Sequence, residues 1–195
     1  MTRPAGPLTG VSFVAGVATG IGLAKVPFPR PGAKPGAIRG YFRGNATGAR
    51  ISVAGQLISA ASLAAFTAQV ARAAEGRARV AALAGGGFAT AALATAAAFA
   101  GWLTFKAGED PQCDVAFHRA MFLAGGPAHG AAFGVLLAAL GTGTDALPER
   151  PALAIAAVNL LAPLYLLDER AAWLIPAGRF PGLIAVGIAG PRLAR

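Results

Sequence analysis

The chain has 195 residues, of which 55% are hydrophobic and 13% are charged, and its formal net charge is +9. Soluble domains carry about 25% charged residues, so this composition excludes an ordinary water-soluble fold. The basic residues lie in loops beside apolar stretches, and only Tyr41 and Phe42 put aromatic side chains among them. This placement favours anionic lipid headgroups over nucleic acid as the partner of the positive charge.

Long uncharged intervals follow one another along the sequence. About 18 or more consecutive residues that are mostly apolar and uncharged are typical of a membrane-spanning helix. The intervals therefore predict an all-α fold, a polytopic transmembrane helix bundle of about six spans in a single domain over residues 1–195. The predicted spans are residues 5–24, 51–71, 80–105, 120–144, 151–168 and 175–194.

The first predicted span begins like a signal peptide, because Arg3 precedes an apolar run. That run is longer than the roughly 7–15 residues of a signal-peptide core, and five further hydrophobic segments follow. We therefore expect an uncleaved helix at residues 5–24.

The polar loop of residues 25–50 carries six Lys or Arg residues and no acid. Its prolines exclude a helix at the start. We expect its second half to lie along the membrane surface, with Tyr41 and Phe42 at headgroup depth. The arginines expected beside lipid phosphates are Arg39, Arg43 and Arg50.

The predicted span 51–71 contains two uncharged polar residues, Gln56 and Gln69, which we expect to face the bundle. A short turn with Arg72, Arg77 and Arg79 follows. Compact basic turns stay on the cytoplasmic side, so we place both termini in the cytoplasm and Cys113 outside.

The predicted span 120–144 contains a glycine ladder, Gly126, Gly130 and Gly134. Glycines four residues apart let a neighbouring helix approach closely, so we assign these three to helix packing. His129 lies in the same span and, as a polar group in lipid, needs a partner.

Asn159, Gln56 and Gln69 are the candidate partners of His129, and together the four form a candidate intramembrane polar site. One interpretation is a hydrogen-bonded contact between helices. The other is the polar lining of a path for a solute or protons, because ionisable residues inside a membrane are commonly functional.

The last predicted span contains Arg179, which would be costly at the centre of the bilayer. If the helix starts at Pro176, Arg179 lies in its first turn. We therefore expect its side chain to reach the headgroups.

Catalytic and metal-binding patterns are absent from the sequence. His118 and His129 are eleven residues apart, about 16 Å along a helix, which is too far for one metal ion. A pair of haems would need four histidines, and the single Cys113 excludes a cysteine-rich metal site. No HExxH, GxSxG or phosphate-binding loop occurs. We predict no cofactor, no metal and no enzymatic activity.

Four short motifs carry a resemblance: Tyr41-Phe42-x-x-Asn45, Arg72-Ala73-Ala74-Glu75-Gly76, Gly125-Gly126-Pro127-Ala128-His129, and Pro176-Ala177-Gly178-Arg179-Phe180-Pro181-Gly182. With this layout the chain resembles uncharacterised six-helix integral membrane proteins of high-GC, actinobacterial-type bacteria. The resemblance implies a helical bundle in a bacterial cytoplasmic membrane. It brings no known activity, substrate or site.

Two functions remain as expectations. The first is a structural or accessory component of the membrane. The alternative is a permease or channel subunit for a small solute or protons, with its polar site around His129. The bilayer itself, a second copy of the chain or a membrane partner protein would be the partner.

Overall fold

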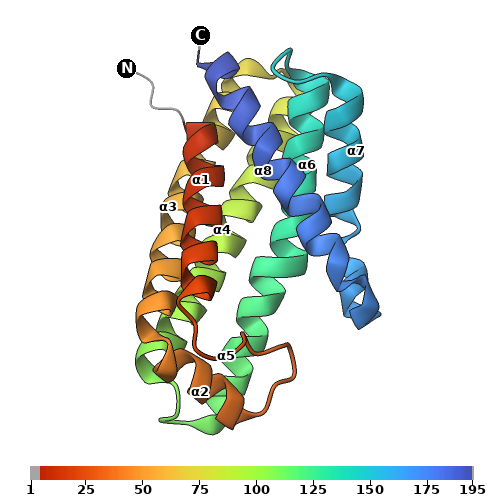
Figure 1. Ribbon diagram of the computed structural model, residues 1–195. Coiled ribbons are helices and arrows are strands. Elements are labelled where there is room, and N and C mark those ends of the chain that lie inside the picture. Colours follow the sequence, from red (N-terminus) through yellow and green to blue (C-terminus); the bar gives the residue numbers. More distant parts are fainter. Residues whose placement is uncertain (1–4, 195) are drawn as a thin grey trace.

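The computed structural model describes residues 5–194, and this part of the chain is helical without strands (Figure 1). The elements are α1 (Ala5–Gly22), α2 (Pro35–Gly44), α3 (Ala46–Ala73), α4 (Gly76–Lys106), α5 (Pro111–Leu123), the π-helix η1 (Ala124–Ala128), α6 (His129–Gly143), α7 (Glu149–Leu160), the 3-10 helices η2 (Ala162–Leu166) and η3 (Glu169–Trp173), and α8 (Leu174–Leu193). The prediction of an all-α bundle is confirmed.

Helices α3 and α4 and the continuous column of α5, η1 and α6 run the length of the molecule (Figure 1). Helix α1 packs on α3. Helix α8 crosses the bundle obliquely, between α1 and the C-terminal end of α7. The first and last described residues lie at one end, which we call the terminal end. Residues 23–45 and 107–110 lie at the opposite, loop end.

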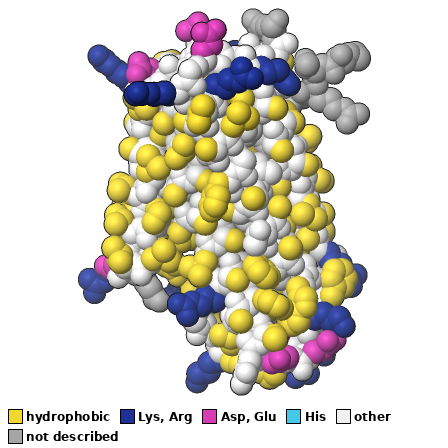
Figure 2. Space-filling model, turned by 180° about the vertical axis from the view of Figure 1, so that it is seen from behind, with side chains coloured by type: hydrophobic (Ala, Val, Ile, Leu, Met, Phe, Trp, Pro, Cys, Tyr) yellow, Lys and Arg dark blue, Asp and Glu magenta, His cyan; other side chains and the backbone are white. Residues whose placement is uncertain are grey.

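Five helical stretches are long and apolar enough to cross a membrane. They are Ala5–Gly22, Ala46–Ala73, Gly76–Lys106, Pro111–Gly143 and Arg170–Leu193. Large hydrophobic side chains such as Val11, Phe88 and Ile184 are exposed on their outer faces. Figure 2 shows this apolar surface as a belt between two ends where the charged side chains gather. Such a belt is the surface that a bilayer would cover.

Glycines bring the first helix against its neighbours. A Cβ atom placed on Gly16 of α1 would lie 2.7 Å from the Cα of Gly55 in α3. At the terminal end, a Cβ on Gly6 would lie 2.9 Å from the Cα of Gly190 in α8. The helices can approach this closely only because these positions have no side chain.

The predicted span 151–168 is not a single helix. Helix α7 has 12 residues and ends at Leu160, and a 3-10 segment continues the chain to Leu166. Pro163 has no N–H to donate and disfavours helical backbone at the residue before it, so the α-helix ends here. At about 18 Å, α7 alone is shorter than the hydrocarbon core of a bilayer.

The predicted span 120–144 begins earlier than expected, because the helical column starts at Pro111. The Asp110 side chain accepts hydrogen bonds from the backbone N–H groups of Gln112 and Cys113, at 2.8 and 3.2 Å, and Pro111 follows it directly. Hydrogen bonds from the Cys113 side chain and these backbone groups hold the pKa of Asp110 below its ordinary value. Asp at the N-cap position followed by Pro at the first helical position is a signal for the start of a helix. The prediction missed this signal because it was based on the uncharged interval alone.

The polar loop 25–50 folds back on the bundle. Ile38, Tyr41 and Phe42 of α2 are 0%, 3% and 2% exposed, and they form a second core with residues of α4 and α5 such as Leu103 and Met121. The amphipathic helix α2 thus buries its apolar face, with Tyr41 and Phe42, against protein. Their depth relative to the lipid headgroups stays a prediction. Arg39 and Arg43 of α2 and Arg50 at the start of α3 remain exposed.

Candidate functional site

His129 is buried in the middle of the bundle, at 3% exposure. Its Nδ1 lies 3.0 Å from the carbonyl oxygen of Ala89 in α4, and its ring stacks on Phe133 with 5.4 Å between centroids. The histidine therefore links α6 to α4 through a backbone group.

The other residues of the predicted polar site have different partners. The Asn159 amide donates to the carbonyls of Ile155 and Gly178, at 3.0 and 2.9 Å, and so links α7 to α8. Gln69 is buried with its Oε1 unpartnered, whereas Gln56 lines a cavity. Thirteen residues at about 100° each put the two glutamines roughly 140° apart, so they face different neighbours.

The glycine ladder lies against three different elements. A Cβ on Gly130 would lie 2.8 Å from the Cβ of Ala162, and one on Gly134 would lie 2.8 Å from the carbonyl oxygen of Ala156. Gly126 instead faces a side-chain methyl of Ile175 in α8. From Gly126 to Gly134, the ladder thus contacts α8, η2 and α7 in turn along the column.

Arg179 lies at a position that the sequence did not predict. Because α8 begins at Leu174, Arg179 lies in its second turn, and its side chain points into the bundle instead of reaching the headgroups. The guanidinium donates to the carbonyl of Gly125 and lies 5.1 Å from the centroid of the Phe13 ring. Its Nε is buried without a partner.

The carbonyl that receives Arg179 belongs to the π-helix η1. Pro127 lies inside this segment and cannot donate to the helical ladder. A π-turn inserts one extra residue into a helix and displaces its carbonyls from their usual partners. The segment Gly125-Gly126-Pro127 therefore leaves the carbonyl oxygen of Gly125 available inside the bundle. The guanidinium of Arg179 donates a hydrogen bond to it.

Arg179 lines a cavity of about 350 Å³ between α1, the column and α8. Its apolar wall includes Phe13, Val17, Leu93, Met121, Phe122 and Ile175. Gln56 and Tyr165 add two uncharged polar side chains, and no Asp or Glu is among the described residues that line the cavity. The positive charge of Arg179 therefore has an aromatic face and a carbonyl beside it, but no carboxylate.

The cavity lies where α1 and α8 diverge. The two helices touch at Gly6 and Gly190 near the terminal end and separate towards the loop end (Figure 1). A smaller pocket of about 140 Å³ continues from the cavity, and both are lined by Val17, Phe28, Gln56 and Met121. The volumes place the Arg179 cavity near the lower end of the range for small-ligand sites, about 300–1,000 Å³.

No protein-family model matches the chain, and no curated protein or solved structure is significantly similar to it. A proposal for the function therefore has to rest on the geometry of Arg179 and its cavity.

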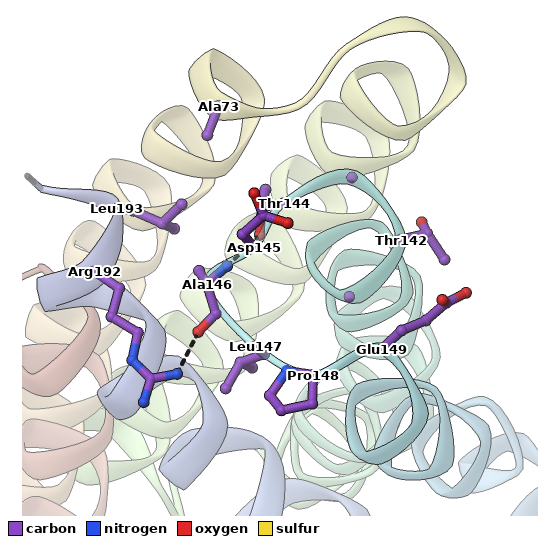
Figure 3. Close-up of a pocket in the computed structure, with 12 residues that line it drawn as sticks. Ala73, Thr142, Thr144, Asp145, Ala146, Leu147, Pro148, Glu149, Arg192 and Leu193 are labelled. Carbon is purple, nitrogen blue, oxygen red and sulfur yellow. Dashed lines mark hydrogen bonds between the residues drawn. The ribbon is translucent and has the colours of Figure 1, made fainter.

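A larger, open hollow of about 960 Å³ lies at the terminal end, between the turn that joins α6 to α7 and the end of α8. The Arg192 guanidinium donates to the carbonyl of Ala146 at 2.9 Å (Figure 3). Figure 3 shows Thr142 and Glu149 on the far side of that turn from Arg192. Backbone and small side chains form most of this surface, and its one arginine has a partner, so we assign it no ligand.

A carboxylate or phosphate is the chemical partner that the Arg179 cavity lacks. The planar guanidinium presents several N–H donors to such a group and forms strong charge-assisted hydrogen bonds with it. The apolar wall around it suits a hydrocarbon chain. The arrangement can therefore bind a molecule that has one anionic head and an apolar body.

Proposed function

We propose that the chain is a multi-pass integral membrane protein that binds an anionic amphiphile in the Arg179 cavity. The apolar belt between two charged ends supports a position across the bilayer. We assign six crossings, in which α7 and η2 together make the fifth, because both described ends lie on one side of the bundle. The assignment to a bacterial cytoplasmic membrane rests on the resemblance described above.

The natural cysteine tests the orientation. We expect Cys113 at the loop end to react with a membrane-impermeant maleimide in intact cells, because the compact basic turn of Arg72, Arg77 and Arg79 places the terminal end in the cytoplasm. The measurement is the mass shift of the protein before and after cell lysis, with Cys113→Ser as the control. Labelling only after lysis would reverse the proposed orientation.

The unneutralised charge of Arg179 is the observation that carries the proposed ligand. Holding an arginine in an apolar interior costs several kcal/mol unless an anion or several hydrogen bonds compensate. Among the described residues, its compensation is one carbonyl and one aromatic ring. An anionic headgroup would complete it.

The position of the cavity favours an amphiphile that comes from the membrane. Arg179 precedes Arg192 by 13 residues, about 20 Å along α8, so a headgroup bound there would lie well inside the hydrocarbon layer. The divergence of α1 and α8 supports a lateral route from the leaflet at the loop end. A headgroup held at that depth fits a permease, which moves its substrate across the membrane, better than an accessory component.

Binding of twelve-carbon amphiphiles to the purified protein tests this function. We expect dodecyl phosphate and dodecanoate to bind, and dodecyltrimethylammonium not to bind, in calorimetric titrations in neutral detergent. Arg179→Gln should weaken binding by at least about 30-fold, because truncation of one partner of a buried charged pair costs about 2–5 kcal/mol. Arg170→Gln, at an exposed arginine near the same end of α8, is the matched control and should leave binding unchanged.

Equal binding of the cationic amphiphile, or unchanged binding by Arg179→Gln, would refute the proposed ligand. If inorganic phosphate competed as strongly as dodecyl phosphate, the alkyl chain would not be recognised. We would then assign the protein as a channel for a small anion and not as a permease for an amphiphile.

A further inference from the structure

A second, fully apolar groove lies on the outside of the bundle, away from the Arg179 cavity. It has a volume of about 680 Å³ and runs along the column from Leu123 to Val135, with Phe88 of α4 on one side and Leu160 of α7 on the other. The twelve residue steps from Leu123 to Val135 correspond to about 18 Å of helix. The length is close to the depth of one leaflet, about 15 Å.

The groove exists because helix α7 is short and the residues that line the groove on α4 and the column are mostly small. Helix α7 ends at Leu160, and Pro163 turns the chain into η2, so the N-terminal half of α6 has no full-length helix on the α7 side. The floor of the groove is made by small residues, among them Gly85, Ala128 and Ala131. Its side chains contain no hydrogen-bonding group.

A polar pocket of about 320 Å³ adjoins the groove at its loop end, since both are lined by Leu123 and Leu166. His118 and Arg119 of α5 line this pocket. Phe122 and Tyr165 line both this pocket and the Arg179 cavity, and therefore lie between the two.

Two side chains of α5 give this pocket its polar character, His118 and Arg119. His118 is 1% exposed; one of its ring nitrogens is hydrogen-bonded to the backbone of Pro29, and the other, Nε2, has no hydrogen-bond partner. Asp114, one turn earlier, is directed elsewhere, because its Oδ2 accepts from the N–H of Gly108 at 2.7 Å. Within the described part of the chain, Arg119 has no carboxylate at salt-bridge distance.

We infer that this pocket and groove together bind one anionic phospholipid. The phosphate lies beside Arg119, and the unpartnered Nε2 of His118 accepts a hydrogen bond from a hydroxyl group of the same headgroup. One acyl chain lies in the groove between α4 and α7 and fills the space that the short helix leaves. The lipid is a separate ligand from the amphiphile of the Arg179 cavity.

The experiment is native mass spectrometry of delipidated protein after incubation with lipid. The probes are dioleoylphosphatidylglycerol, dioleoylphosphatidylcholine and glycerol 3-phosphate. We expect one phosphatidylglycerol to be retained, at least tenfold more strongly than phosphatidylcholine, and glycerol 3-phosphate not to be retained. Equal retention of phosphatidylcholine would show that the charge is not recognised. Equal retention of glycerol 3-phosphate would show a site for free phosphate and not for a lipid.

Variants separate the two parts of the site. Arg119→Gln removes the charge, and Ala131→Phe fills the groove, so each should lower phosphatidylglycerol retention at least tenfold. The matched controls are Arg170→Gln and Ala65→Phe, which change an exposed arginine and an exposed alanine elsewhere and should have no effect. Retention that survives Ala131→Phe would exclude the acyl chain from the groove, and retention that survives Arg119→Gln would exclude the headgroup site.

Arg179→Gln keeps this inference distinct from the proposed function. It should weaken dodecyl phosphate binding by at least about 30-fold and leave phosphatidylglycerol retention intact. Loss of both ligands in Arg179→Gln would mean that there is one continuous site, and the separate lipid site would be wrong.

Discussion

Gly16→Leu should lower the melting temperature of the detergent-solubilised protein by about 2–12 °C. Overpacking of a close contact costs about 1–3 kcal/mol, and each kcal/mol corresponds to about 2–4 °C in a chain of this size. The effect is expected at the upper end because the Cβ would meet the backbone of Gly55, at 2.7 Å, and not a flexible side chain. Helix α1 would have to move away from α3.

The control for this substitution is Gly87→Leu. Gly87 lies on an exposed face of α4, and a Cβ placed there would meet no atom within 4 Å. Circular dichroism at 222 nm during heating gives the two melting temperatures. If the two variants melted together, contact between α1 and α3 through glycine would not contribute to stability.

Arg179→Met should raise the melting temperature of the ligand-free protein while it removes amphiphile binding. Replacing buried charged groups with well-packed hydrophobic residues is often stabilising, by about 1–4 kcal/mol. Arg179 has one carbonyl and one aromatic ring to offset the cost of its partial burial. A residue kept at the expense of stability is typical of a functional site.

Arg192→Met tests whether any loss of arginine has this effect. Arg192 donates to the carbonyl of Ala146 at the charged terminal end, so its removal should not raise the melting temperature. A fall in the melting temperature of Arg179→Met, to below that of the unmodified protein, would show that the bond to Gly125 holds α8 to the column. Arg179 would then be a structural residue.

Charge-free intervals predicted the existence of the long helices but not their ends. The predicted span 51–71 corresponds to α3, which runs from Ala46 to Ala73 and so includes two arginines, Arg50 and Arg72. A helix does not stop where the hydrocarbon layer does, because charged residues can continue it into the headgroup region. The break after Leu160 was signalled by Pro163, but the uncharged interval hid it.

The candidate site was harder to predict than the fold. Gln56 was identified from its type, and it lines the cavity. Arg179 was assigned to the membrane surface because an arginine in lipid is costly, and that estimate takes no account of partners supplied by other helices. Its partner is the carbonyl oxygen of Gly125, 54 residues away, which a π-turn leaves available. Neither the spacing nor the composition of the sequence predicts that contact.

The contact between Gly6 and Gly190 joins the first described helix to the last. During synthesis, about 5–20 residues are added each second, so α1 waits on the order of ten seconds or longer for α8 to emerge. Until then the face of α1 that bears Gly6 and Gly10 has no partner, and the wall of the cavity that carries Arg179 does not exist. A nascent chain that stops before α8 should therefore be recognised by membrane quality control as an open bundle.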